Sequence, residues 1–187
     1  MLNGWERDGR VFADVMQFDS PPLFPRPDGT VAETGTPARL LRWSLHPDAG
    51  TNAFSRTEFD DLAGEFPRFD ERRAGLPYRY GAIAARTRYG TVQDSIAWYD
   101  LVGGRCALYT MPEGDGMSEP VFVPPLPDAA EGDGWLLALA YRAAENRNDL
   151  LVPDTGAIGR GPVASVELAH RVPFGFHGNF VPSDVQL

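Results

Sequence analysis

Short apolar runs, separated by glycine, proline and acidic residues, recur along the whole 187-residue chain. Alternation of apolar and polar positions over a few residues is typical of half-buried β-strands, and turn signals every roughly 8 to 12 residues favour an all-β fold. The fold would be a sandwich, a barrel or the blades of a propeller. The predicted strands are residues 11–18, 38–45, 52–59, 78–88, 95–101, 105–111, 120–123, 135–142, 150–152 and 162–168, and the segment that contains His177 closes the series.

Turn residues between neighbouring runs predict two hairpins. Residues 47–50 (PDAG) would join the second and third runs, and residues 102–104 (VGG) would join the fifth and sixth. Residues 135–142 (WLLALAYR) are apolar enough for a helix, but glycines before the run and an Asn-rich turn at 144–149 leave it short, which favours a strand. Residues 21–37 are the loosest segment.

Composition and charge narrow the class of protein. An apolar fraction of 43% and no composition shift predict one domain spanning residues 1–187. The net charge of -9 opposes binding to nucleic acid, and the pair Arg72-Arg73 is expected on a solvated face or in ion pairs. With Cys106 as the single cysteine, no apolar run of membrane-spanning length and no export pattern at the N-terminus, we expect a cytoplasmic protein.

Residues 172–180 (VPFGFHGNF) set His177 among apolar residues and glycines. Neutral imidazole binds iron, zinc, copper and nickel well, and flanking glycines let backbone and metal approach closely. This context suits a buried metal ligand. A single histidine among apolar residues is more often an ordinary core residue, so both interpretations stay open.

Glu65 and Glu119 each stand among apolar residues beside a proline. A partly buried glutamate needs a partner, and a histidine N–H is one that would also fix the tautomer of a metal ligand. A glutamate at a surface strand end is the alternative, and the residues alone favour it. His46 and His170 are expected to be ordinary polar residues.

Other polar and glycine-rich stretches predict loops rather than sites. Residues 156–161 (GAIGRG) lie between two predicted strands and open no predicted helix, so a turn is expected instead of a phosphate site. The acidic residues around Asp60-Asp61 and at 113–115 lack the ligand spacing of a calcium loop and are expected in solvated loops.

Four motifs, in order and at similar spacing, resemble the C-terminal portion of the carotenoid cleavage oxygenase family, which includes the lignostilbene dioxygenases. They are residues 65–67 (EFP), 118–124 (SEPVFVP), 132–135 (GDGW) and 170–178 (HRVPFGFHG). The resemblance implies blades of a seven-bladed β-propeller whose axis holds one non-haem iron, Fe(2+), on four histidines. It makes His177 the last of these ligands, and Glu65 and Glu119 two of the three glutamates that orient the histidines.

The N-terminal residues 3–6 (NGWE) also resemble a family motif, one in which a ligand histidine stands three residues before the asparagine. That position falls just before Met1. The resemblance therefore implies three ligands upstream of Met1, an incomplete propeller of around four blades at roughly 40 to 45 residues each, and an isolated chain that is inactive and prone to aggregate. Pro153 and Ala169 depart from the family pattern.

The implied function is iron-dependent dioxygenase chemistry that cleaves a conjugated C=C bond of a carotenoid, apocarotenoid or stilbene into two carbonyl products. Its partners would be dioxygen and an apolar conjugated alkene. Phe174 and Phe176 would line the substrate tunnel or fill the core. Peripheral membrane contact stays open, and no obligate protein partner is inferred. The alternatives are a non-catalytic β-rich fragment without bound iron and a propeller hydrolase that uses another metal.

Overall fold

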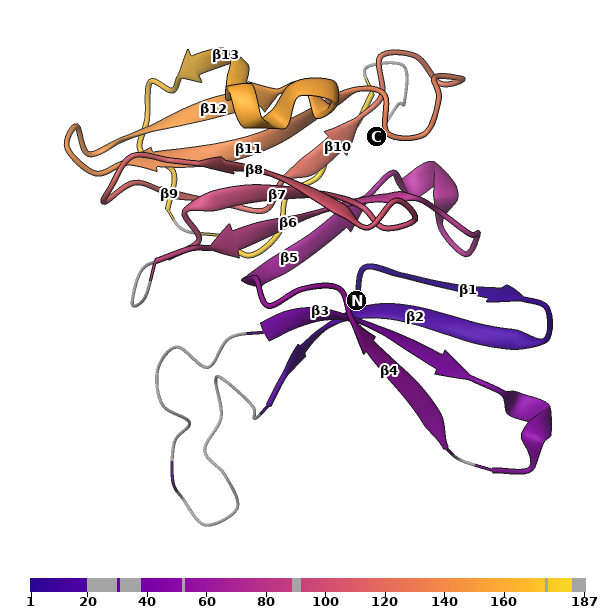
Figure 1. The fold of residues 1–187 in the computed structure, drawn as a ribbon. Helices are drawn as coiled ribbons and strands as arrows, with labels where there is room; N and C mark the ends of the chain where they lie inside the picture. Colours follow the sequence, from indigo (N-terminus) through magenta and orange to yellow (C-terminus); the bar gives the residue numbers. More distant parts are fainter. Residues whose placement is uncertain (20–29, 31–37, 52, 89–91, 174, 183–187) are drawn as a thin grey trace.

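The computed structural model describes residues 1–19, 30, 38–51, 53–88, 92–173 and 175–182. Within them, thirteen strands form three antiparallel sheets (Figure 1). The strands are β1 (Asn3–Arg7), β2 (Arg10–Phe18), β3 (Ala38–Leu45), β4 (Phe54–Glu58), β5 (Ala63–Phe69), β6 (Tyr80–Arg86), β7 (Ser95–Asp100), β8 (Arg105–Thr110), β9 (Gly116–Met117), β10 (Val121–Val123), β11 (Trp135–Arg142), β12 (Arg147–Pro153) and β13 (Pro162–Glu167). The 3₁₀ helices are η1 (Pro47–Ala49), η2 (Glu71–Arg73) and η3 (Thr155–Arg160).

Within each sheet, strands that follow one another in the chain pair with one another, apart from β9. The first sheet is β1-β2-β3-β4, the second β5-β6-β7-β8, and the third β10-β11-β12-β13 with β9 also on β11. Both predicted hairpins are confirmed, because Leu45 pairs with Phe54 and Asp100 pairs with Arg105. The strand interpretation of residues 135–142 is also confirmed.

The second sheet lies between the other two (Figure 1), and its inner strands β6 and β7 are buried on both faces. All six residues of β7 are buried. Its central residues therefore form a continuous apolar run, whereas a strand with one face in water would alternate apolar and polar residues. One face packs against β11 and β12 through Ile96 and Trp98, and the other packs against Leu40 of the first sheet. The described part of the chain thus has two cores that share one sheet.

Three local predictions are wrong. The described residues around His177 form no strand, because Pro173, Gly175 and Gly178 interrupt any run of ladder-forming residues. The expected turn at 144–149 is shorter, since β12 begins at Arg147. Residues 156–161 lie largely within η3 rather than in a simple turn. The loose segment 21–37 lies almost entirely outside the described residues.

Strands β1, β5 and β9 were not predicted. β5 carries Gly64 and Pro67, which read as turn signals, and β9 is two residues long. None of the described helices is long and apolar enough to cross a membrane.

Candidate functional site

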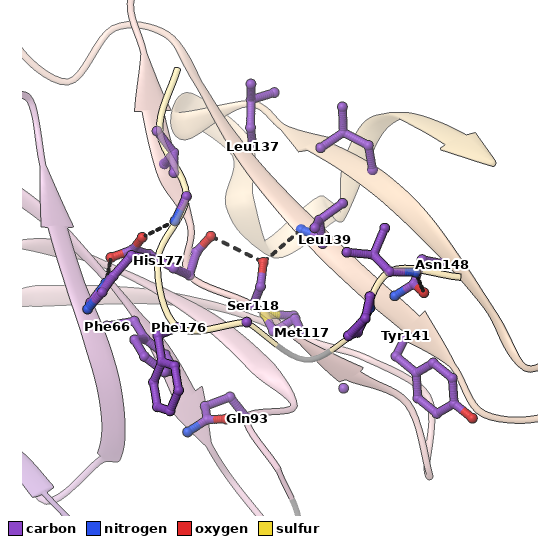
Figure 2. A pocket seen from close by; sticks show the side chains of 18 of the residues that line it. Phe66, Gln93, Met117, Ser118, Leu137, Leu139, Tyr141, Asn148, Phe176 and His177 are labelled. Atoms are coloured by element: carbon purple, nitrogen blue, oxygen red, sulfur yellow. Dashed lines mark hydrogen bonds and ion pairs between the residues drawn. The ribbon is translucent and has the colours of Figure 1, made fainter. Parts of the chain in front are cut away.

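A pocket of about 630 Å³ opens between β5, the third sheet and the C-terminal segment. Its wall is largely apolar, with Leu137, Leu139 and Leu150 projecting from β11 and β12. Polar groups enter it at a few points, among them Glu65, Glu119 and His177, so all three residues predicted as a metal site line one cavity. Figure 2 shows this pocket and labels His177. Such a combination of apolar walls and few polar groups is typical of small-molecule sites.

His177 and Glu119 form a hydrogen-bonded pair at this pocket (Figure 2). The distance from His177 Nδ1 to Glu119 Oε1 is 3.1 Å, and the Gly178 amide donates to Glu119 Oε2 at 2.9 Å. A carboxylate only accepts, so the proton belongs on Nδ1 and the Nε2 lone pair is directed elsewhere. This is the arrangement in which a carboxylate fixes the tautomer of a ligand imidazole.

The two members of the pair differ sharply in exposure. The Glu119 side chain is 4% exposed, so the surface alternative for this glutamate is wrong. The His177 side chain is 73% exposed, so the prediction of a buried imidazole is wrong as well. The glycines beside His177 and the lack of a strand there leave the ring at the pocket mouth, where the Phe66 ring meets it edge-on at 5.8 Å.

Hydrogen bonds to the third sheet fix the backbone next to Glu119. The Ser118 amide donates to the Leu139 carbonyl at 2.8 Å, and the Leu139 amide donates to Ser118 Oγ at 3.0 Å. Pro120 follows Glu119 directly and is fully buried. The carboxylate therefore leaves a rigid stretch between β9 and β10 and points toward the C-terminal segment.

Glu65 is half-buried on β5 and contacts an amide rather than an imidazole: Gln93 Nε2 donates to its Oε2 at 3.1 Å. Burial raises the pKa of the Glu65 carboxyl above its ordinary value, while the Arg86 charge and the Gln93 hydrogen bond oppose the rise. A half-buried carboxylate at a pocket wall suits an orienting role toward a further cationic or N–H partner.

The remaining predicted residues lie away from this pocket or serve the fold. His46 and His170 are exposed and do not line the pocket. Asp115 is not in a solvated loop as predicted: it is buried and accepts from Arg142 and the Ala143 amide. Arg72 pairs with Asp70, as one of the two interpretations expected.

Among the described residues, no three His, Cys, Asp or Glu side chains gather as a metal site. His177 is thus one imidazole with its carboxylate, and Glu65 lies on the same cavity. Phe176 lines the pocket and is 72% exposed, so it is not a core residue, whereas Phe174 lies outside the described residues. Sequence reasoning missed Gln93 and Arg68, although Arg68 directly follows the motif at 65–67.

Comparison with known proteins gives the class that this fold and site define. The family model described as retinal pigment epithelial membrane protein matches residues 1–182. The chain therefore belongs to this family, the carotenoid oxygenases, as the motifs predict.

The named relatives of the chain are oxygenases. It is 33% identical to an isoeugenol monooxygenase of Pseudomonas nitroreducens over 97% of the chain and 41% of that protein. It is 31% identical to an apocarotenoid-15,15'-oxygenase of Synechocystis over 95% of the chain and 37% of that protein. The lignostilbene dioxygenase structure from Pseudomonas brassicacearum superposes with a TM-score of 0.91 at 28% identity, covering 97% of this chain and 41% of that one. The chain spans about two fifths of the length of these relatives.

Proposed function

We propose that this chain is part of an iron(II)-dependent dioxygenase that cleaves a conjugated C=C bond into two carbonyl products. The observation that carries the proposal is the His177–Glu119 pair at the mouth of an apolar pocket, 3.1 Å apart, in a chain of the carotenoid oxygenase family. Relatives named for isoeugenol, lignostilbene and apocarotenoid oxidation support the reaction class.

The donor set fits a metal such as iron(II). An imidazole that carries its proton on Nδ1 presents Nε2 as a ligand, and a buried carboxylate raises the basicity of that ligand. A solved structure of a Synechocystis relative is cobalt-substituted, which supports a divalent-metal site in that relative. We propose His177 as the direct ligand here, with Glu119 orienting it and Glu65 orienting another ligand of the same centre.

Iron(II), when bound, would supply the one-electron chemistry that lets dioxygen react with a closed-shell alkene. In cleavage, each alkene carbon takes one oxygen atom of the same dioxygen, so two C=O bonds replace one C=C and one O=O. His177 and Glu119 would fix the position of the centre. Leu137, Leu139 and Leu150 would exclude water and hold a flat conjugated substrate.

The fold supports a finer proposal for the whole protein. Three antiparallel sheets packed face to face in chain order are what consecutive blades of a β-propeller look like, and the solved relatives superpose over almost the entire chain. We propose that these sheets are blades of a seven-bladed propeller and that the alkene-cleaving activity belongs to that whole protein.

The test is metal content and alkene cleavage in the whole protein and two variants. His177→Ala should lose most bound iron and, with it, cleavage of a hydroxystilbene or isoeugenol, because one imidazole ligand is removed. His170→Ala is the matched control, since His170 is exposed and does not line the pocket. Wild-type iron content in His177→Ala would overturn the assignment of the ligand.

The alternative is a β-rich protein without bound iron. It is favoured by one observation: in the described ranges no metal-ligand cluster of three side chains forms. Wild-type protein that takes up no iron and shows no oxygen-dependent cleavage would support this alternative.

A further inference from the structure

Strand β5 contains a β-bulge directly beside the candidate site. Glu65 pairs with Ala84 and Arg68 pairs with Ala82, so two residues of β5 stand opposite the single residue Ile83. Ala82 and Ala84 are two apart and share a face, and their partners Glu65 and Arg68 therefore also share one. Without the bulge, residues three apart would point to opposite faces.

Phe66 occupies the bulge with φ of 52°, a left-handed conformation that a bulky side chain rarely adopts. Such backbone strain persists where the surrounding structure determines it, and bulges often re-aim a side chain near a functional site. Here the bulge brings the Phe66 ring to the edge of the His177 ring and directs Arg68 toward the C-terminal segment.

The Arg68 guanidinium contacts Glu119 and the two residues that follow His177. Nη1 donates to Glu119 Oε2 at 3.3 Å and to the Gly178 carbonyl at 3.1 Å, and Nη2 donates to Asn179 Oδ1 at 3.2 Å. Nη2 also pairs with Glu71 at 2.6 Å. The Arg68 side chain is only 15% exposed, and its contact with the buried Glu119 carboxylate is shielded from water more than its contacts with the surface residues Glu71, Gly178 and Asn179.

These contacts determine how the Glu119 carboxylate is oriented and which of its oxygens faces His177. Its Oε2 accepts from both Arg68 and the Gly178 amide, which fixes the carboxylate plane and leaves Oε1 for His177 Nδ1. The segment around His177 has no strand ladder to hold it. The planar fork of arginine is suited to this task, because it binds several oxygens in a fixed geometry.

We propose that Arg68 is a positioning residue that sets the orientation and tautomer of His177 through Glu119 and the 178–179 backbone. The inference rests on the proposed function where it takes His177 as a metal ligand. The placement of the imidazole itself can be measured without any metal.

The first experiment measures ring ¹⁵N shifts of histidine-labelled, metal-free protein at a pH where the imidazoles are neutral. The spectra are recorded on the whole protein, and the signals that disappear in His177→Gln are those of His177. In wild type, His177 should be the Nδ1-protonated tautomer. In Arg68→Gln, His177 should become a mixture of the Nδ1-protonated and Nε2-protonated tautomers, as in a solvated imidazole. The Gly178 amide proton should exchange about tenfold faster or more, which corresponds to a loss of roughly 1.4 kcal/mol in the free energy that protects it.

Arg105→Gln is the control, because Arg105 is an exposed arginine that pairs with Asp100 on the second sheet. It should leave the His177 shifts and Gly178 exchange as in wild type. Arg68→Lys keeps the charge without the fork and guards against misfolding of Arg68→Gln: it should retain the wild-type melting temperature more closely yet still shift the tautomer. Wild-type shifts and exchange in a folded Arg68 variant would overturn the proposal.

A second measurement separates this inference from the proposed function. In the whole protein, Arg68→Gln should weaken iron affinity about 10- to 100-fold, as loss of an outer partner of a ligand typically does, while the KM for the alkene stays unchanged. If His177→Ala keeps its iron but Arg68→Gln still alters the His177 tautomer, the ligand assignment fails and the positioning role stands.

Discussion

At the residue scale, the Asp14 carboxylate is a tightly held polar group away from the pocket. It is fully buried and accepts two hydrogen bonds from Arg42, at 2.8 and 2.7 Å, and one from the Tyr78 hydroxyl at 2.5 Å. Asp14 and Arg42 belong to the first sheet, whereas Tyr78 lies between β5 and β6 of the second. A buried charge is tolerated only when it is paired and hydrogen-bonded, so this network ties the two sheets together.

This network predicts sensitivity to alkaline pH. Burial, and next the Asp14 charge, raise the pKa of Tyr78 far above its ordinary value, and burial similarly raises that of Tyr99. Below about pH 10 both folded and unfolded chains hold these protons, so stability is complete. Above it the unfolded chain loses them first, and the free energy of unfolding should fall by up to about 1.4 kcal/mol per pH unit for each tyrosine.

Tyr78→Phe should remove the contribution of one tyrosine to this fall in stability with pH. It should also lower the free energy of unfolding at neutral pH by about 1–3 kcal/mol, because Asp14 loses a hydrogen-bond donor. Tyr99→Phe should remove the contribution of the other tyrosine. Urea unfolding between about pH 8 and pH 11 measures both quantities. An alkaline slope equal to wild type in the Tyr78→Phe, Tyr99→Phe double variant would contradict the argument.

At the scale of the element, the start of β11 depends on a glycine turn. Gly132 has φ of 79°, and a Cβ there would lie 2.3 Å from the Tyr80 ring. The Thr155 hydroxyl lies 2.7 Å from the Gly132 carbonyl oxygen and 2.8 Å from that of Gly134 and shares its one hydrogen between them, so the turn is also joined to η3. The motif at 132–135 is therefore structural: it lets the backbone pass close beside the second sheet.

Gly132→Ala should destabilise the protein more than Gly104→Ala. Gly104 also has a left-handed φ, 63°, but no atom of the described residues lies within 4 Å of its added Cβ. In Gly104→Ala the free energy of unfolding should fall by only about 1–2 kcal/mol, the cost of a left-handed conformation for alanine. In Gly132→Ala it should fall by a further ~1–3 kcal/mol, because overpacking against the Tyr80 ring adds to that cost. Chemical denaturation compares the two, and equal losses would mean that the Tyr80 ring moves aside freely.

At the scale of the whole molecule, the second sheet contributes to both cores. Ile83 and Ile96 lie on adjacent strands, are fully buried and face opposite cores. Each substitution to alanine should cost about 2–5 kcal/mol through lost burial and a cavity. Because both cores need the same sheet, each variant should still unfold in one calorimetric transition at a lower Tm. Two separate transitions, each sensitive to one variant, would show that the cores are independent.

Local pattern was sufficient for much of the fold. Alternation and turn residues are properties of neighbouring positions, so they predicted the hairpins and most strands within a few residues. They failed at β5, where Gly64 and Pro67 resemble a turn but belong to a bulged strand. They failed again around His177, where an apolar run forms no strand because prolines and glycines break the ladder.

The sequence by itself determined the β-rich class, the family and the residues with chemical potential, because composition, periodicity and motifs are carried by the chain. Only the tertiary structure decided their partners. Glu119 meets His177 across 58 positions, and Arg68 meets Gly178 across 110. No local signal encodes such contacts, since it is the packing of the sheets and the bulge in β5 that bring these residues together.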